Sequence, residues 1–431
     1  HLLISTSSGY VLFKWSPFTN IQKLFLTFSY FLFYEYSLIV RSYSVSTLLI
    51  FIFCTLFENR GKNIIKISCV LALLSHTSIF GLFISLCFFL SIILEYSIEF
   101  LLKNKGTRDI WKKSNFIAFF ISIFGFLTSL IQLLPPKDSP TVNTEINFPP
   151  KFSNLIDLCG DIIKSYIPIP ELRLNFWGTT ITNNNFILQI LFILFFIYVF
   201  ITFLKYFIKK PTVIFLYLSS SCILSIFFLL KFPGALRHHG FLFIILIASL
   251  WIFKYCFLKN QNKIENSLKR KVNFAATFLF GLQALAGIIA ASYDAIYPFS
   301  SAKETANFLR KNNFIDSQII SYRDFAGSAV LGHIPNKKSF YYLDSASNGS
   351  YIKWNNRRNR KVKNEDLEEA SLKLSSGGED VILILNDPID AFGFSDKNFR
   401  EIFVSKDSVV ADEKFYVYFF VGSNKSLDKR Q

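Results

Sequence analysis

The sequence contains no methionine and is poor in charge: charged residues make up 18% of its 431 residues, and hydrophobic residues 52%. Soluble domains usually contain about 25% charged residues. This composition therefore excludes an ordinary water-soluble fold for the whole chain. Because methionine is absent and the chain begins at His1 inside an apolar stretch, we expect the sequence to be a segment of a longer protein.

Recognisable catalytic and ligand-binding motifs are also missing. The sequence has no Walker A, dinucleotide-binding, serine-hydrolase or zinc-protease pattern. It has no internal repeat of the kind that many transporters contain. Of the six cysteines, only Cys159 lies outside the apolar runs, so neither a disulfide framework nor metal-ligand spacing is present. We expect no metal and no organic cofactor.

Long runs rich in Phe, Leu and Ile dominate the chain up to about residue 291. Several are close to the roughly 20 residues that cross a bilayer as a helix, namely residues 116–134, 186–204, 212–230 and 241–257. Backbone polar groups must be paired within lipid, so we predict a polytopic α-helical membrane domain over residues 1–291. Earlier runs, such as residues 24–34, are short, and we expect broken or tilted helices there.

The net charge of +16 is concentrated in the gaps between the apolar runs. This placement is typical of cytoplasmic loops and not of a nucleic-acid interface. The basic gaps run from Arg60 to Lys66, Lys103 to Lys113, Lys205 to Lys210 and Lys254 to Lys271. The alternate gaps, at residues 35–43, 75–78, 135–185 and 231–240, are poorer in Lys and Arg. We therefore predict a multi-pass protein of the cell inner membrane, with these alternate gaps on the outer face.

After Tyr297 the sequence becomes that of a water-soluble domain, which the charge pattern places outside the cytoplasm. We predict a small α/β domain over residues 300–431. The expected helices are residues 301–312, 324–332 and 364–374, the first of them capped by Ser300 or Ser301. The expected strands are residues 318–322, 381–385 and 415–421, and the apolar run 381–385 is typical of a buried parallel strand.

Charges at membrane depth are costly and often functional, and a first cluster of them lies at residues 34–43 on the predicted outer face. It contains Glu35, Arg41 and Tyr43. One interpretation is an interfacial ion pair in an aromatic belt. The other is an arginine that binds a lipid-linked phosphate, because the planar guanidinium group suits phosphate oxygens.

A second cluster, at residues 234–240, ends in Arg237-His238-His239-Gly240 and lies in a short outer gap just before an apolar helix. Adjacent histidines cannot share one helix face, which argues against a metal site. The cluster could instead supply donors to a phosphate at the start of a helix, with His238 a stronger donor when protonated. Alternatively, it could anchor the outer domain.

Two further outer segments are candidates. His76-Thr77-Ser78 interrupts an apolar stretch, and His76 has either a structural or a functional role. The long gap at residues 135–185 suits a loop that lies on the membrane, where Phe176 and Trp177 could stack on sugar faces or lie at the lipid interface.

Together these segments and the predicted topology give the chain a resemblance to the GT-C superfamily of integral-membrane glycosyltransferases. The bacterial family-39-like group, related to protein mannosyltransferases and aminoarabinose transferases, is the most similar. Arg41-Ser42-Tyr43 is similar to an Arg-x-Tyr element that opens a helix at the outer face in this group, and His76-Thr77-Ser78 is similar to a turn that follows it. A C-terminal extracytoplasmic α/β domain is common there. The Arg237-His238-His239-Gly240 piece resembles that of a largely uncharacterised bacterial subgroup.

The resemblance implies an enzyme that transfers a sugar from a polyprenyl-phosphate donor to an acceptor hydroxyl group, with inversion at the anomeric carbon. The donor phosphate would be bound by Arg41, Arg237, His238 and His239. Glu35, Tyr43 and His76 would support these residues. The resemblance implies that the reaction can proceed without a metal, because the leaving group is a phosphate held by cations.

The catalytic carboxylate of the GT-C superfamily usually lies in the first outer loop, which here would precede His1. We do not assign that role to Glu35. The outer domain is expected to shape acceptor access and to carry no chemistry.

Two other functions stay open. One is a transporter or flippase of a lipid-linked saccharide, and the other is a membrane-anchored assembly protein whose outer domain binds a partner. The residues before His1 would discriminate between enzyme and transporter. A carboxylate soon after a first transmembrane helix would support the enzyme, whereas a helix pair that echoes a later pair would support the transporter.

Overall fold

The computed structural model describes residues 1–103, 113–139, 146–182, 185–259, 265–358 and 361–421. The chain divides into two compact units. Unit 1 comprises His1–Leu134, Glu145–Glu171 and Gly178–Ser292, and unit 2 comprises Pro135–Thr144, Leu172–Trp177 and Tyr293–Gln431. Two pieces of the outer loop that we assigned to the membrane domain therefore belong to unit 2.

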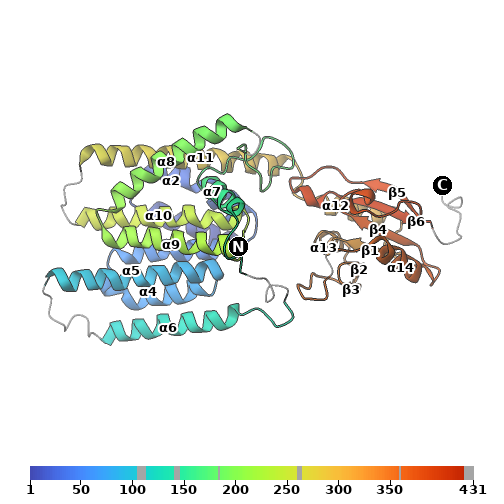
Figure 1. The fold of residues 1–431 in the computed structure, drawn as a ribbon, viewed down its shortest axis with the longest axis horizontal. Coiled ribbons are helices and arrows are strands. Elements are labelled where there is room, and N and C mark those ends of the chain that lie inside the picture. Colours follow the sequence, from blue (N-terminus) through green and yellow to red (C-terminus); the bar gives the residue numbers. More distant parts are fainter. Residues whose placement is uncertain (104–112, 140–145, 183–184, 260–264, 359–360, 422–431) are drawn as a thin grey trace. The chain divides into compact units, whose positions relative to one another are not determined.

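Unit 1 is built from helices (Figure 1). In chain order these are α1 (Leu2–Trp15), α2 (Asn20–Thr27), the π-helix η1 (Tyr30–Leu38), α3 (Tyr43–Phe57), α4 (Arg60–Ser75), α5 (Ile79–Lys103), α6 (Lys113–Leu133), α7 (Phe152–Tyr166), α8 (Phe186–Phe207), α9 (Pro211–Leu230), α10 (Leu236–Lys259) and α11 (Asn266–Ile296).

Six of these helices, among the residues that the structure describes, are long and apolar enough to cross a membrane: α5, α6 and α8 to α11. Their burial differs widely. In the apolar window of α10, 83% of the residues are buried, whereas in α8 only 17% are. An apolar helix that is buried all round lies in the core of a bundle, and one that exposes apolar side chains suits contact with lipid. The helix α10 is thus the centre of unit 1, and it carries Arg237 and the two histidines at its start.

The early part of unit 1 is broken, as the short runs predicted. The apolar run at residues 24–34 is divided between two helices. The α-helix α2 ends at Thr27, and η1 starts at Tyr30 after an extended residue, Ser29. The side-chain hydroxyl of Ser29 donates to the carbonyl of Leu26 (2.7 Å), which helps to close the end of α2.

Two of the basic gaps meet in the structure. Arg60, at the start of α4, and Lys210, just before α9, both form ion pairs with Glu95 near the end of α5. These gaps therefore lie at the same end of the helix bundle, in agreement with one charged face. In the second basic gap, Lys105, Arg108 and Lys112 lie outside the described residues, as do residues 260–264 of the fourth gap.

The loop between α6 and α8 contributes to both units. Its amphipathic helix α7 belongs to unit 1 and exposes Phe152 and Ile156, which suits a helix at the membrane surface. In contrast, Phe176 is buried against Tyr293 (ring centroids 5.4 Å apart), and Trp177 contacts Phe299 (5.7 Å). Neither of the two interpretations of Phe176, contact with lipid or with a sugar face, fits the structure, because the ring is enclosed within unit 2.

Unit 2 contains a mixed six-stranded sheet of order β3-β2-β1-β4-β6-β5. Its strands are β1 (Gln318–Tyr322), β2 (Phe340–Tyr342), β3 (Ser347–Gly349), β4 (Val381–Leu385), β5 (Phe399–Val404) and β6 (Tyr416–Phe420). The strand β1 pairs in parallel with β2 and β4, and the remaining pairs are antiparallel.

Helices cover both faces of this sheet (Figure 1). The helices α12 (Ala302–Lys311) and α13 (Asp324–Leu331) pack on one face. The helix α14 (Asn364–Ser375) packs on the other. The short 3₁₀ segments η3 (Ile389–Phe392) and η4 (Ala411–Glu413) complete the unit.

The three helices and three strands that we predicted for this domain are confirmed, including β4 as a buried strand parallel to β1. The hydroxyl of Ser300 accepts from the backbone N–H of Ala302 (3.1 Å) at the start of α12. We did not predict β2, β3 or β5. The first two have only three residues each, which is too short for a periodic pattern. The third lies at the edge of the sheet, where burial does not impose alternation.

Candidate functional site

The candidate site begins in η1, where a carboxylate is buried among tyrosines. Glu35 is 1% exposed, and the hydroxyl of Tyr30 donates to its Oε2 (3.3 Å). The adjacent Tyr34 and Tyr36 are also buried. Segments of π-helix are rare and frequently occur at functional sites. Here the π-helix directs a cluster of polar groups into an apolar bundle.

Arg41 and Arg237 converge on Tyr43, the first residue of α3. The side chain of Arg237 is hydrogen-bonded with the Tyr43 hydroxyl, and the charges of Arg41 and Glu35 also act on that hydroxyl. The hydroxyl of Tyr36 donates to the backbone carbonyl of Arg237 (2.7 Å). The two clusters that the sequence placed at the outer face, 34–43 and 234–240, therefore form one cluster in the structure, which we call the arginine cluster (Glu35, Tyr36, Arg41, Tyr43, Arg237 and His238).

Glycine at position 240 permits this contact between α10 and η1. A Cβ atom at Gly240 would lie 2.4 Å from the Phe31 ring and 2.5 Å from the Tyr36 hydroxyl. Any larger residue would therefore push η1 away from the start of α10. The glycine after the two histidines thus has a packing role, which the sequence alone did not indicate.

His238 lies in the arginine cluster as a neutral ring. Its Nδ1 accepts a hydrogen bond from the backbone N–H of Ala235 (2.8 Å), so its proton is on Nε2. The ring contacts Tyr43 edge-on (5.8 Å between centroids) and Phe80 (5.3 Å). The protonated form that we expected to strengthen phosphate binding is therefore disfavoured, because protonation of Nδ1 would break the bond to Ala235. His238 has one N–H donor to offer.

His239 faces a different element. Its Nε2 donates to the carbonyl of Pro233 (2.8 Å), and its Nδ1 lies 4.0 Å from Oδ2 of Asp161 on α7. The ring is 2% exposed and stands edge-on to Phe228. These contacts tie the start of α10 to α7 and direct the ring away from the arginine cluster. Sequence reasoning did not single out Asp161, because nothing in the sequence indicates that α7 returns to α10.

His76 is also directed elsewhere. Its Nδ1 lies 2.6 Å from Oε1 of Gln132, and its Nε2 lies 3.1 Å from the hydroxyl of Thr128; both partners are on α6. The next residue, Thr77, accepts a hydrogen bond from Ser46 (2.8 Å) in the first turn of α3. The turn thus supports the start of α3, whereas the histidine itself joins α4 to α6.

A cavity of about 540 Å³ adjoins the arginine cluster. It lies between α1, η1 and α3, and Tyr36 lines it. Its apolar wall includes Leu12, Phe33 and Phe51, and hydroxyl groups occur at Ser37 and Ser44. Tyr36 thus belongs both to the cavity lining and to the arginine cluster, where its hydroxyl donates to the backbone carbonyl of Arg237.

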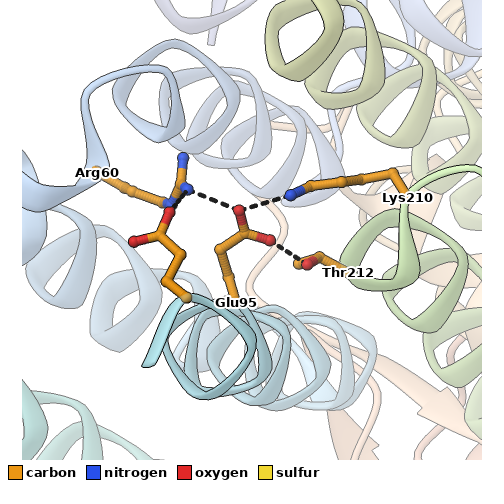
Figure 2. Close-up of polar contacts among 5 residues, drawn as sticks. Arg60, Glu95, Lys210 and Thr212 are labelled. Carbon is orange, nitrogen blue, oxygen red and sulfur yellow. Dashed lines mark hydrogen bonds and ion pairs between the residues drawn. The ribbon is translucent and has the colours of Figure 1, made fainter. Parts of the chain in front are cut away.

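A second polar cluster lies at the opposite, basic end of the bundle (Figure 2). The carboxylate of Glu95 accepts from Arg60 (2.6 Å), from Lys210 (2.7 Å) and from the hydroxyl of Thr212. Arg60 also pairs with Glu99 (2.6 Å). We call this set the Glu95 network. It joins α4, α5 and α9, and the sequence analysis missed it because Glu95 lies inside an apolar run.

Within the described residues, no group of three or more His, Cys, Asp or Glu side chains is placed to hold a metal ion. No protein-family model, curated protein or solved structure matches this chain. The assignment of a function therefore depends on the placement of the chain's own residues.

Proposed function

We propose that this protein is a membrane glycosyltransferase that transfers a sugar from a polyprenyl-phosphate donor to an acceptor at the outer face. The observation that carries the proposal is the convergence of Arg41 and Arg237 on Tyr43. The two residues come from distant parts of the sequence, and both lie at the ends of apolar helices. Glu35 is buried in this cluster, whereas Arg41, Tyr43 and Arg237 are half-buried.

A phosphate group fits the chemistry of this cluster. The charges of two guanidinium groups act on one hydroxyl, and a bound phosphate would carry the opposite charge. Guanidinium groups donate two parallel hydrogen bonds to phosphate oxygens. The Tyr43 hydroxyl and Nε2–H of His238 would add neutral donors. In the reaction, the bond between the anomeric carbon and the phosphate oxygen breaks, and these donors would stabilise the charge that develops on the leaving phosphate.

The adjoining cavity suits the lipid part of such a donor. A polyprenyl chain is apolar and would occupy the space between α1, η1 and α3, beside Leu12, Phe33 and Phe51. Because Tyr36 belongs to both the cavity and the arginine cluster, a lipid lying in the cavity would bring its phosphate toward the arginines. Catalytic deprotonation of the acceptor is not assigned to Glu35, which is enclosed by tyrosines and hydrogen-bonded to Tyr30.

The second candidate is a transporter of a lipid-linked saccharide. The Glu95 network favours it, because ion pairs that join three helices at one end of a bundle can act as a gate. A transporter would have to break these pairs in each cycle. An enzyme that acts at the other end would keep them intact.

The test uses the purified chain in lipid nanodiscs and a polyprenyl phosphate that carries a labelled sugar. We expect the labelled donor to bind saturably. Polyprenyl phosphate without sugar should compete with it, because this molecule has the lipid chain, whereas inorganic phosphate should not compete. Absence of saturable binding would refute the proposal. In liposomes, movement of the intact labelled lipid across the bilayer, with the sugar–phosphate bond unbroken, would favour the transporter instead.

A further inference from the structure

The segment that joins β3 to α14 in unit 2 is strongly basic. From Ala346 to Lys363 the sequence contains six Lys or Arg residues and no Asp or Glu. Two aromatic residues, Tyr351 and Trp354, are interleaved with this charge, and they are 63% and 55% exposed. We call residues 350–358 the basic loop. Its composition, exposed rings among cations, is that of a surface that contacts an anionic partner.

Two contacts within unit 2 hold the basic loop in place. The backbone N–H of Asn356 donates to the carbonyl of Asp138 (2.7 Å). Arg358 forms an ion pair with Asp324, in which its Nε donates to Oδ2 (2.9 Å), and its Nη2 lies 3.7 Å from Oδ1 of Asp344. Both carboxylates are buried. Arg358 is therefore directed inward and fastens the loop to the strand ends of the sheet.

The two exposed rings of the basic loop are stacked on cations. The guanidinium carbon of Arg358 lies 4.4 Å from the centroid of the Trp354 ring, and Nζ of Lys353 lies 5.6 Å from that of Tyr351. Because Arg358 is fixed by buried carboxylates, it also limits the movement of Trp354. A ring that is ordered before binding loses little conformational entropy when a partner covers it. The exposed parts of the rings are thus prepared for contact.

Lys353 and Arg357 carry the outward charge of the basic loop. Both side chains are exposed, and neither forms an ion pair with a carboxylate of any residue that the structure describes. Lys and Arg close to a bilayer that contains anionic lipids are attracted to its surface, and the attraction decays within a Debye length. Such a surface would supply the negative charge that the loop itself lacks.

The bond to Asp138 favours a membrane as the partner. Asp138 follows Leu133, the last residue of α6, by five positions, and α6 is long and apolar enough to cross a bilayer. Five residues of chain reach at most about 18 Å. If α6 spans the membrane, Asp138 and the loop bonded to it lie near the bilayer surface. A nucleic acid or an acidic protein would also suit the charge, but neither accounts for this position.

We propose that the basic loop docks on the membrane surface. Trp354 and Tyr351 would lie at the interface, where Trp and Tyr are enriched, and Lys353 and Arg357 would bind the headgroups of anionic lipids. The inference does not depend on the proposed function. It gives unit 2 a contact of its own with the bilayer, in addition to its covalent connections to the helices.

The experiment measures how strongly lipids with brominated acyl chains quench the fluorescence of Trp354 in the full chain, reconstituted in nanodiscs. The difference between the parent and Trp354→Phe isolates this signal from that of the other tryptophans. We expect strong quenching in bilayers that contain phosphatidylglycerol and little in bilayers of phosphatidylcholine alone. Added salt should weaken the quenching, because it screens exposed charges. These comparisons use the parent protein and do not depend on the folding of a charge variant.

A probe at the far edge of the sheet is the control for position. Val404 is exposed at the end of β5, which is separated from β3 by five strand spacings, or about 24 Å. A tryptophan introduced by Val404→Trp in the Trp354→Phe background should be quenched little in either bilayer. The proposal is overturned if Trp354 is quenched no more than this probe, or equally in the two bilayers.

Charge reversal tests the cations directly. The double variant Lys353→Glu and Arg357→Glu should reduce the quenching of Trp354 to the level of the Val404→Trp probe. Arg400→Glu is the matched control, because Arg400 is exposed on β5, and it should leave the quenching unchanged. Equal quenching in the parent and the double variant would overturn the proposal. Donor binding at the arginine cluster is measured separately, so that its failure would leave the docking of the loop unaffected.

Discussion

At the scale of single residues, Arg41 and Arg237 carry the proposed recognition of phosphate. A charge-assisted hydrogen bond contributes roughly 1.5–3 kcal/mol, and about 1.4 kcal/mol corresponds to a tenfold change in affinity. Lysine keeps the charge but lacks the planar pair of donors. We therefore expect Arg41→Lys and Arg237→Lys each to weaken binding of a polyprenyl-phosphate sugar by about tenfold or more, measured with the purified protein in nanodiscs.

Arg270→Lys is the control for both variants. Arg270 is exposed at the basic start of α11, far along the chain from the arginine cluster. Its replacement should leave donor binding unchanged. If the Arg41 and Arg237 variants bind the donor as the parent does, the phosphate assignment is wrong.

The burial of Asp344 leads to a separate prediction, about the pH dependence of the free energy of unfolding. This burial, and then the charge of Asp324, raise the pKa of Asp344 to about 6, and Arg358 and Arg323 offset this only in part. An unfolded Asp has a pKa near 3.9. The folded state binds the proton more tightly, so the free energy of unfolding should fall as pH rises from about 4 to about 6, by on the order of 3 kcal/mol.

The measurement is thermal unfolding of unit 2, followed in the full chain by amide hydrogen exchange of β1 and β2, between pH 4 and pH 7. Asp344→Asn carries no titrating proton at this position. In this variant the free energy of unfolding should therefore fall much less between pH 4 and pH 6 than in the parent. A variant with the same pH slope as the parent would show that another group is responsible.

At the scale of elements, α11 packs closely against the joint between α2 and η1. A Cβ atom at Gly287 would lie 2.2 Å from the carbonyl oxygen of Phe28, a backbone atom that cannot move aside. Gly287→Ala should therefore lower the free energy of unfolding by roughly 1–3 kcal/mol, as overpacking does. The readout is the thermal midpoint of the purified protein.

The same helix supplies the control. At Gly281 the nearest atom to a new Cβ would be in the ring of Phe25, at 3.5 Å, which is an ordinary contact. Alanine is the better helix former, so Gly281→Ala should be neutral or slightly stabilising. Equal midpoints for the two variants would contradict the close packing at Gly287.

The Glu95 network makes the second prediction at this scale. The side chain of Glu95 is 3% exposed and has three donors (Figure 2). The side chain of Glu99 is 30% exposed and pairs with Arg60. Removing one member of a buried ion pair leaves its partners uncompensated. Glu95→Gln should destabilise the protein by on the order of 3 kcal/mol, and Glu99→Gln by about 1 kcal/mol or less.

Thermal midpoints in detergent compare the two variants. A larger loss for Glu99→Gln would contradict the central place of Glu95. Donor binding at the other end of the bundle should survive both changes, provided that the protein still folds.

At the scale of the whole molecule, the basic end of the bundle predicts the orientation of unit 2. Arg60 and Lys210 lie at one end, and cytoplasmic loops are rich in Lys and Arg. The first turns of α11 contain Lys269, Arg270 and Lys271, and the helix ends at Ile296, where the chain has entered unit 2. We therefore expect the C-terminus to lie outside the cytoplasm. A reporter fused after Gln431 should be active if it requires that location and inactive if it requires the cytoplasm.

Alkaline phosphatase, which is active outside, and a fluorescent protein, which is active inside, give opposite readouts for this fusion. A truncated chain that ends at Lys209 and carries either reporter is the control, because that gap is predicted to be cytoplasmic. Fluorescence after Gln431 would reverse the assigned orientation.

The long apolar helices, the two-part organisation and most elements of unit 2 could be predicted from the sequence. Composition and run length determine these properties locally: an apolar run of sufficient length must be helical in lipid, and residues 381–385 were apolar enough to identify a buried strand. The break between α2 and η1 was expected only in general terms, because short apolar runs do not specify where a helix ends.

Only the tertiary structure decided which polar residues meet. It brought Arg41 together with Arg237 and directed His76 and His239 toward other helices. It also revealed the Glu95 network and the contact of the basic loop with Asp138. The physical reason is that lipid requires each run to be a helix but leaves open which helices pack together. That choice depends on shape, as at Gly240 and Gly287, and on ion pairs between residues far apart in the chain.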